Sequence, residues 1–359
     1  MHSLEQFRKQ VVRQSLFAQR SLRDAMNRLG FVQADPIRCP ARAQDLILRH
    51  RARNYKAGDL ERSYPQLELE ECYLYAYGFL SKDLWRIIHP TTKDALTDSQ
   101  INALELIEKR GPVSPKDLEA QLGGERARNC WGGYSRTAKL DLEDLHECGA
   151  LRIARREKGN RIYEIAERFE QCLSERERFK EILIAALMAM GATTRRFLMS
   201  ELSHFRNLVA SAPDRRACLQ ELIDSGRIRT DIVDSVEYLS IEGEKTARRP
   251  LDSVRILAPF DPIVRDRTRF EHFWNWTYRF EAYTPKTKRK LGYYAMPVLW
   301  RDQVIGWANA TVDNGILSVD FGYVDTKPND PKFKQAVQTE IARMANFLGL
   351  EADCWKTSI

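Results

Sequence analysis

Two polar side chains near the N-terminus, Gln33 and Asp35, have the types and spacing that hydrolytic chemistry needs. They follow Gly30, which comes after an amphipathic segment and is typical of a residue that ends a helix. Pro36 disfavours a helical backbone at Asp35. In an extended chain residues two apart point to the same side, so we expect an amide and a carboxylate to lie together. Such a pair can position a water or face a developing cation, although an ordinary strand end with solvated polar groups has the same pattern.

Length and composition indicate a globular protein with several domains. A chain of 359 residues exceeds what one hydrophobic core usually holds, so we expect about two to four domains. Its 43% apolar and 30% charged residues are typical of a folded protein rather than a disordered one. The longest apolar run, residues 182–190, is far shorter than the about 18 residues of a membrane span. We expect no membrane association.

The N-terminus and the cysteines are those expected of a cytoplasmic protein. Residues 1–5 show no charged region followed by an apolar run, so they do not resemble a secretion signal. The seven cysteines are scattered and include no Cys-x-x-Cys pair, which indicates reduced thiols rather than disulfides or a zinc site. The six histidines form no metal-binding pattern, and we expect neither a metal nor a cofactor.

Basic residues outnumber acidic ones, 57 against 50, and give a net charge of +7. An excess of this sign favours an anionic partner. The basic residues gather in four segments, 49–53, 152–161, 265–269 and 286–290. A single charge run is usually a solvated face, but four clusters in different regions are also typical of nucleic-acid binding.

An internal repeat predicts the architecture of the first two thirds of the chain. Residues 145–152 recur as residues 222–229, and each copy has a helical segment, a glycine and a short alternating stretch. Two shorter helical patterns precede each copy, at 101–110 and 115–122 and again at 181–190 and 194–202. Three helices followed by a hairpin are the order of a winged helix. The N-terminal region has a looser version, with helical patterns at 4–17 and 21–29 before a strand, so we predict three tandem winged helices.

The two predicted hairpins of the repeat differ in charge. Residues 152–161 carry five basic side chains around a Gly-Asn turn, which suits contact with phosphates. The corresponding hairpin of the third unit contains Asp231, Asp234 and Glu237. We therefore expect the second wing to bind DNA and the third to be structural.

The C-terminal third is predicted to be a small α+β domain. Alternating strands are expected at 293–300, 303–312 and 316–323, with a hairpin turn at 313–315 and a helix at 331–348. Residues 284–292 carry four cations and are expected to form an exposed hairpin tip. The fold class is therefore α+β, three tandem winged helices followed by a β-rich domain, with boundaries at 1–95, 96–172, 173–248 and 249–359.

Three motifs in order and at matching spacing resemble one family across nearly the whole chain. They are LGFVQAD at 29–35 with Arg42 downstream, PFDPIVRDR at 259–267, and YRFEAY at 278–283 running into 292–294. This set is similar to the bacterial winged-helix DNA glycosylases typified by AlkZ and YcaQ, which unhook crosslinks. The resemblance implies three tandem winged helices and a β-rich domain around a channel for duplex DNA.

The resemblance also implies an activity and its residues. The activity is hydrolysis of the N-glycosidic bond of an alkylated purine, an N7-alkylguanine-type monoadduct, an interstrand crosslink or both. The family signature of Gln, an aliphatic residue and then Gln or Asp maps onto Gln33, Ala34 and Asp35. Ala34 is smaller than usual, and residues 43–45 follow Arg42 where some members carry histidines. These differences concern the lesion that is recognised more than the reaction.

The two signature side chains fit that reaction. N7-alkylation makes the purine cationic, so it leaves without a proton from an acid, and an oxocarbenium-like sugar and the attacking water remain to be stabilised. Asp35 can orient or deprotonate the water, and Gln33, which has a donor and an acceptor, can hold it. No lysine lies at 33–35 to form a Schiff base, so we expect a monofunctional glycosylase that leaves an abasic site.

Candidate DNA contacts are the basic side chains in or near these segments. Residues 49–53 lie close in sequence to the signature, although a solvated helix end explains them equally well. We expect the protein to act as a monomer on double-stranded DNA. The side chains expected to contact DNA are Arg42, Arg49, Arg51, Arg53, Arg155, Arg156, Lys158, Arg265, Arg267, Lys286, Lys288, Arg289 and Lys290.

A non-enzymatic winged-helix regulator would explain the repeats and basic wings equally well. It gives no reason for the pairing of Gln33 with Asp35, and regulators usually dimerise with paired recognition helices. Here the candidate recognition helix of the second unit, residues 135–148, is largely acidic. A phosphodiester hydrolase is a third alternative, but the sequence shows no carboxylate cluster for two metal ions. The glycosylase is the leading hypothesis.

Overall fold

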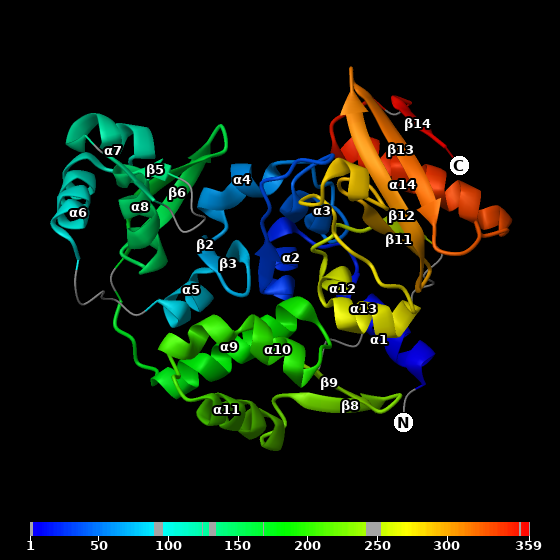
Figure 1. The fold of residues 1–359 in the computed structure, drawn as a ribbon, viewed down its shortest axis with the longest axis horizontal. Helices are drawn as coiled ribbons and strands as arrows, with labels where there is room; N and C mark the ends of the chain where they lie inside the picture. The colour runs from blue at the N-terminus through cyan, green and yellow to red at the C-terminus, as the bar shows by residue number, and fades with distance from the viewer. Residues whose placement is uncertain are drawn as a thin grey trace.

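The structure is a computed structural model that describes residues 3–89, 96–123, 125–128, 134–167, 169–241, 253–351 and 353–358. Helices and strands are interspersed throughout these described residues, so the α+β class is confirmed. In Figure 1 the N-terminal part (blue) lies in the middle, with the second part (teal) to the left, the third (green) below and a twisted sheet (orange) to the right.

The N-terminal part contains two helices followed by a strand, as expected, and then a hairpin. Its elements are α1 (Leu4–Ser15), α2 (Leu22–Leu29), β1 (Phe31–Gln33), α3 (Ala43–Leu48), α4 (Asp59–Ser63), the 3-10 turn η1 (Tyr64–Gln66), β2 (Leu69–Tyr73), β3 (Tyr77–Ser81) and α5 (Lys82–Ile88). The three strands form one sheet in the order β1-β3-β2. The hairpin β2–β3 therefore supports β1 from one side.

The second and third parts repeat one order of three helices and a hairpin. The second contains α6 (Asp98–Arg110), α7 (Pro115–Leu122), the short pair β4 (Arg126–Arg128) and β5 (Tyr134–Arg136), α8 (Thr137–Glu147), β6 (Leu151–Glu157) and β7 (Asn160–Ile165). The third contains α9 (Glu175–Met190), α10 (Arg195–Glu201), η2 (Ser203–Asn207), α11 (Ala212–Asp224), β8 (Arg229–Val233) and β9 (Val236–Ser240). The predicted repeat corresponds to this shared order.

One further contact is common to both repeats and could not be predicted from the sequence. Val113, between α6 and α7, forms an antiparallel bridge to Tyr163 in the hairpin, and Thr193 forms the equivalent bridge to Leu239. The bridging hydrogen bonds are 2.8 and 2.9 Å long in the second part and 2.7 and 3.0 Å in the third. Each hairpin is thus tied to the turn between the first two helices of its own part.

The C-terminal part is a five-stranded sheet with a long helix. Its elements are β10 (Val254–Ile256), α12 (Pro262–Arg265), α13 (Arg267–Trp274), the 3-10 turn η3 (Lys286–Lys288), β11 (Met296–Trp300), β12 (Gln303–Asp313), β13 (Ile316–Tyr323), α14 (Pro331–Phe347) and β14 (Trp355–Thr357). The strand order is β10-β11-β12-β13-β14. The hairpin turn expected at 313–315 joins β12 to β13, and Asn314 and Gly315 there have the positive φ of 47° and 77° that a tight hairpin turn requires.

Buried side chains join these parts into one body. One core cluster contains residues of the first, second and C-terminal parts, among them Leu46, Leu145 and Met344. Another joins β2, β3 and α5 to α9 and α11. Helix α1 packs on α12 and α13, with Phe7 edge-on to Phe273 at 5.9 Å, so the N-terminal helix contributes to the C-terminal part. In the described residues no helix is long and apolar enough to cross a membrane.

Candidate active site and DNA-facing surface

Gln33 is the last residue of β1, and Asp35 lies two residues beyond it. Gln33 is opposite Gly78 in the pairing of β1 with β3. A Cβ at residue 78 would lie 2.4 Å from the carbonyl oxygen of Val32 and 2.5 Å from the ring of Phe31. Only glycine therefore allows β3 to approach β1 this closely, and the pairing fixes the backbone at the end of β1.

Asp35 is a half-buried carboxylate that interacts with backbone groups of its own turn. Its Oδ1 accepts a hydrogen bond from the N–H of Ile37 at 2.8 Å, and its own N–H donates to Oε1 of Gln44 at 3.4 Å. Burial raises the pKa of Asp35, and the hydrogen bond from Ile37 offsets only part of that rise. No basic side chain of the described residues contributes to the shift. A carboxylate with a raised pKa is a stronger base than an ordinary aspartate.

Tyr294, from the C-terminal part, lies near enough to the Asp35 carboxylate to feel its charge. Its side chain is 1% exposed, and within the described structure its hydroxyl lacks a hydrogen-bond partner. Burial raises the pKa of Tyr294, and the negative charge of Asp35 raises it further. The neighbouring Tyr293 is 43% exposed, so one tyrosine of this pair faces inward and the other outward.

Gln33 is bound by an arginine from a distant part of the chain. Nη1 of Arg265, at the end of α12, donates to Oε1 of Gln33 at 2.7 Å. Nη2 of the same guanidinium forms an ion pair with Glu201 of α10 and reaches the carbonyl oxygen of Tyr75 at 3.4 Å. The guanidinium also lies over the Tyr75 ring, 4.9 Å from its centroid. The amide of Gln33 is thus held where three parts of the chain meet.

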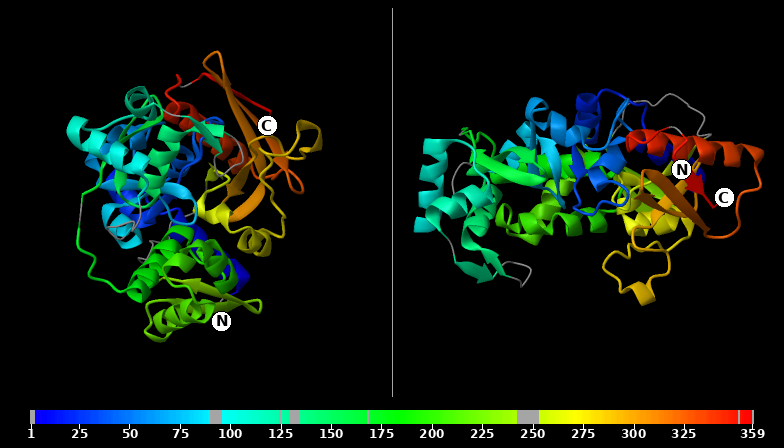
Figure 2. Two further views of the ribbon diagram at one scale, coloured as in Figure 1. Left: turned by 60° about the vertical axis from the view of Figure 1, so that its left-hand side comes forward. Right: turned by 90° about the horizontal axis from the view of Figure 1, so that it is seen from above.

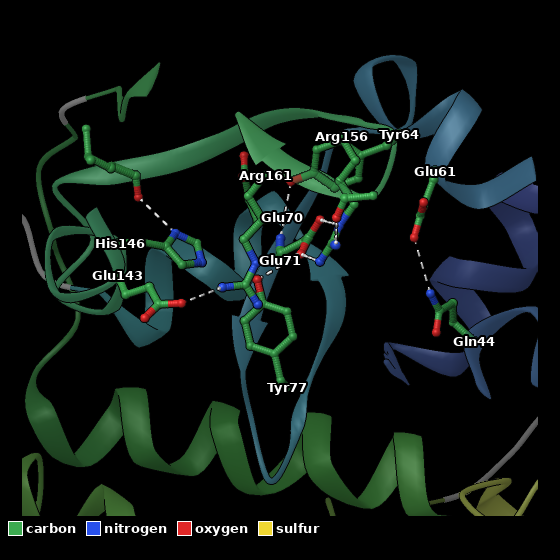
Figure 3. Close-up of polar contacts among 12 residues, drawn as sticks. Gln44, Glu61, Tyr64, Glu70, Glu71, Tyr77, Glu143, His146, Arg156 and Arg161 are labelled. Carbon is green, nitrogen blue, oxygen red and sulfur yellow. Dashed lines mark hydrogen bonds and ion pairs between the residues drawn. The ribbon is translucent and has the colours of Figure 1, made fainter. Parts of the chain in front are cut away.

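A charged cavity of about 590 Å³ is connected to Asp35 through side chains. Gln44, whose oxygen contacts the N–H of Asp35, donates from Nε2 to Glu61 at 3.4 Å, and Glu61 pairs with Arg42. Figure 3 shows the Gln44–Glu61 contact. The cavity wall carries two carboxylates, those of Asp45 and Glu61, and the cations Arg38, Arg42, Arg62, Arg156 and Lys158.

Comparison with known proteins identifies the family. A model of the family described as "DNA glycosylase AlkZ-like" matches residues 26–347. The chain therefore belongs to the AlkZ-like DNA glycosylase family. The fold is similar to that of the Streptomyces sahachiroi DNA glycosylase AlkZ, with a TM-score of 0.65 and 16% sequence identity over 99% of this chain and 100% of the other. The resemblance inferred from the sequence is confirmed, and the regulator hypothesis is wrong because the protein is a DNA glycosylase.

The structure of this AlkZ-like glycosylase corrects the expectation that Arg49 and Arg51 contact DNA. Arg51 is fully buried and forms a bidentate ion pair with Asp261 at 2.7 and 2.9 Å. Arg49 is buried against Glu340 of α14 at 2.5 Å and the carbonyl oxygen of Ile256 at 3.1 Å. These guanidiniums have no exposed group for a phosphate, because they join the N-terminal part to the C-terminal sheet.

Two further predicted DNA contacts, Arg265 and Arg267, are also engaged inside the AlkZ-like fold. Arg265 binds the amide oxygen of Gln33. Arg267 donates to the carbonyl oxygens of Val264 at 2.6 Å and Pro259 at 2.9 Å and lies 4.4 Å from the centroid of the Tyr278 ring. Burial lowers the pKa of Arg267 to about 10. Both guanidiniums are thus held by internal contacts while remaining partly exposed, and their contact with DNA stays a prediction.

The basic hairpin β6–β7 is largely neutralised by the hairpin β2–β3. Arg156 forms two hydrogen bonds of 2.6 Å with the buried carboxylate of Glu71, and Arg161 lies 4.3 Å from the centroid of the Tyr77 ring (Figure 3). Arg152 pairs with Glu70 at 2.7 Å. Burial alone would raise the pKa of Glu71, but the hydrogen bonds and charge of Arg156, with Arg161 and Tyr77, outweigh it and lower that pKa.

Two cations of the hairpin β6–β7 remain on the surface. Lys158 at the turn is exposed, and Arg155 is exposed and paired with Glu157 at 2.6 Å. The sequence predicted the basic hairpin but not its acidic partners, because Glu70 and Glu71 belong to a different part of the chain. Arg53 is likewise exposed, unlike Arg49 and Arg51 beside it.

The expected basic hairpin at residues 284–292 is wrong, because this segment is a loop whose only regular element is η3 (Lys286–Lys288). The carboxylate of Glu281 accepts hydrogen bonds from the N–H groups of Lys290, Leu291 and Gly292, the shortest at 2.7 Å. The Glu281 side chain thus takes the backbone N–H groups that would pair with a second strand in a hairpin. The loop stands away from the body in the right-hand view of Figure 2.

Within this loop the cations differ in their surroundings. Lys286, Lys288 and Lys290 are exposed. Arg289 is partly buried, donates to the carbonyl oxygen of Thr284 at 2.8 Å and lies over the Tyr293 ring, 4.9 Å from its centroid. In the described part of the chain no group of three or more His, Cys, Asp or Glu residues could hold a metal ion.

Several residues around the signature were not predicted. Gln44 and Glu61 connect Asp35 to the cavity, and Glu201 and Tyr75 hold Arg265. The sequence carries no signal for Glu201, which lies in a helix of ordinary composition far along the chain. Gln44 lies in the segment after Arg42 where the sequence differs from the family pattern, and this difference was the one local signal that could have indicated it.

Proposed function

We propose that this DNA glycosylase hydrolyses the N-glycosidic bond of alkylated purines, in N7-alkylguanine-type monoadducts, interstrand crosslinks or both. It acts as a monofunctional enzyme and leaves an abasic site. The proposal rests on the Asp35 carboxylate, which is half-buried and has a raised pKa. No cation of the described residues lowers that pKa. An uncompensated negative charge suits a site in which the substrate itself supplies the positive charge.

In the proposed reaction the cationic base leaves with the electrons of the C1′–N bond and needs no acid. The carboxylate of Asp35 faces the oxocarbenium-like sugar and accepts a proton from the attacking water. At about 4 Å and an effective dielectric constant of about 20, such a contact is worth roughly 4 kcal/mol. That energy corresponds to about a thousandfold in rate.

The helix, helix, helix, hairpin order of the second and third parts supports three tandem winged helices at 1–95, 96–172 and 173–248, followed by a β-rich domain at 249–359. The proposed partner is double-stranded DNA with alkylated bases, bound by a monomer in the bacterial cytoplasm. The exposed cations are the proposed phosphate contacts: Arg53, Arg155, Lys158, Lys286, Lys288 and Lys290. Lys158 also lines the charged cavity, together with Arg42 and Arg156, whose guanidiniums are paired with Glu61 and Glu71.

A base-release assay tests this proposal directly. The protein is incubated with a duplex oligonucleotide carrying one N7-alkylguanine, and free base and an alkali-labile site are measured. We expect both to appear in equal amounts, with strand cleavage only after alkali. Strand cleavage by an amine-dependent lyase step would contradict monofunctionality, and the absence of free base from all alkylated duplexes would contradict the proposed substrate.

A further inference from the structure

Arg265 determines what the amide of Gln33 can do. The guanidinium has only donors, so it can bind only the oxygen of a primary amide. The contact of 2.7 Å between Nη1 of Arg265 and Oε1 of Gln33 therefore fixes which end of the amide faces inward. The Nε2 group of Gln33 must point the other way, where it can donate to a substrate or a water.

The guanidinium is itself held in place from two sides. Glu201 of α10 pairs with Nη2, and the ring of Tyr75 lies beneath it at 4.9 Å. The side chains of Arg265 and Glu201 are only 17% and 22% exposed. An amide bound by such a restrained donor cannot rotate without losing a charge-assisted hydrogen bond, which is about twice as strong as a neutral one.

We propose that Arg265 is a positioning residue that makes Gln33 a hydrogen-bond donor toward the attacking water. This inference rests on the proposed function and assigns a direction to the contact. A water has two lone pairs and two protons: one lone pair accepts from Nε2 of Gln33, the other attacks C1′, and one proton passes to Asp35. The C1′–N bond breaks as the C1′–O bond forms, and the electron pair of the broken bond neutralises the departing alkylpurinium.

Glu201 has a second role in this arrangement. An unpaired guanidinium close to the reacting sugar would oppose the positive charge that develops there. The ion pair with Glu201 neutralises Arg265 and leaves its hydrogen bond to Gln33 intact. The third part of the chain thereby contributes to a site whose two proposed catalytic groups lie in the first part.

Single-turnover kinetics on duplex with N7-alkylguanine separate this role from a purely structural one. Gln33→Glu keeps an acceptor for Arg265, and even forms an ion pair with it, but has no N–H to donate. We expect a melting temperature no lower than that of the parent and a rate lower by about 100-fold or more, the loss typical of removing one preorganised donor. A Gln33→Glu variant with the parent rate would overturn the proposal.

Variants of Arg265 test the positioning step. Arg265→Ala frees the amide and should lower the rate at least about tenfold with little change in Kd for DNA, whereas Arg265→Lys keeps a donor and should recover part of the rate. Glu201→Gln should lower the rate while the hydrogen bond to Gln33 persists. Arg195→Ala, which removes an ion pair with Glu237 at the other end of α10, is the matched control and should keep the parent rate.

The failure of this inference is distinguishable from failure of the proposed function. If the parent protein releases no alkylated base, the proposed function fails. If the parent is active and Arg265→Ala keeps its rate, or if Arg265→Lys is no better than Arg265→Ala, Arg265 does not position Gln33 and the inference is overturned.

Discussion

Arg51 and Asp261 form a bidentate ion pair, at 2.7 and 2.9 Å, in which both side chains are completely buried. The pair joins the segment after α3 to the start of α12, and the same guanidinium donates to the carbonyl oxygens of Ser15 and Ile47 at 2.9 Å. Because Asp261 caps α12 and α12 ends with Arg265, this pair anchors the helix that carries the arginine bound to Gln33. Arg51, which was predicted to contact DNA, is thus a buried structural residue behind the candidate site.

Removing Arg51 should destabilise the fold. Arg51→Ala leaves the Asp261 carboxylate buried without its partner, which costs about 3–5 kcal/mol. Arg53→Ala, two residues away and exposed, should change the free energy of unfolding by no more than about 0.5 kcal/mol. Urea denaturation followed by circular dichroism measures both. An Arg51→Ala protein of unchanged stability with weakened DNA binding would instead place Arg51 on the DNA-binding surface.

Removing the charge of Asp35 should impair the chemical step and not binding. From the charge-contact energy we expect Asp35→Asn to lower the single-turnover rate at least about a hundredfold. The Kd for the alkylated duplex should stay close to that of the parent. Asp83→Asn, at an 89% exposed carboxylate on α5, is the control and should behave as the parent. Equal rates for the two variants would remove Asp35 from the mechanism.

The rate should depend on pH through Asp35. Because burial raises the pKa of this carboxyl, the active ionised form is lost as the pH falls through a value above the ordinary aspartate pKa of about 3.9. The rate should therefore be constant near neutral pH and fall on the acid side earlier than an exposed aspartate would allow. Asp35→Asn should lack this acid limb, and an unchanged limb in that variant would assign it to another group.

The Glu71–Arg156 pair should stabilise the fold in a pH-dependent way. The folded pKa of Glu71 is lowered, so its contribution is fully present above the ordinary glutamate pKa of about 4.3 and is lost as the pH falls through the folded value. Glu71→Gln should cost about 3–5 kcal/mol at neutral pH, because it leaves Arg156 without its buried partner. Urea midpoints at several pH values measure this, and the difference between variant and parent should shrink in acid. A difference that is independent of pH would contradict the ion pair.

The exposed lysines of the C-terminal loop should control the salt dependence of binding. Changing Lys286, Lys288 and Lys290 to Gln should weaken affinity and reduce the slope of log K against log salt by about 0.9 for each phosphate that these lysines neutralise in the parent. A triple change at Lys9, Lys332 and Lys334, on helices elsewhere, is the matched control. Fluorescence anisotropy at several salt concentrations gives both slopes. Equal slopes for the two triple variants would remove the loop from the DNA-binding surface.

The sequence determined the local features of this protein, since they depend on neighbours along the chain. The repeat predicted two similar sets of three helices and a hairpin, and the strands 303–312 and 316–323 match β12 and β13 within a residue. Gly30 and Pro36 bracket a short strand end that carries Gln33 and Asp35. The spacing of apolar residues in a helix or strand and the residue types of a turn depend on a few adjacent positions, so the sequence alone is enough to predict them.

Only the tertiary structure decided which charges are free and which are paired. Arg49, Arg51 and Arg53 have the same local pattern. The first two are buried and paired with Glu340 and Asp261, which lie more than two hundred positions away in the sequence. Arg53 is exposed. The same holds for the contact from Arg265 to Gln33. Ion pairing in a folded interior depends on distance in space and on exclusion of water, and the periodicity of a sequence encodes neither.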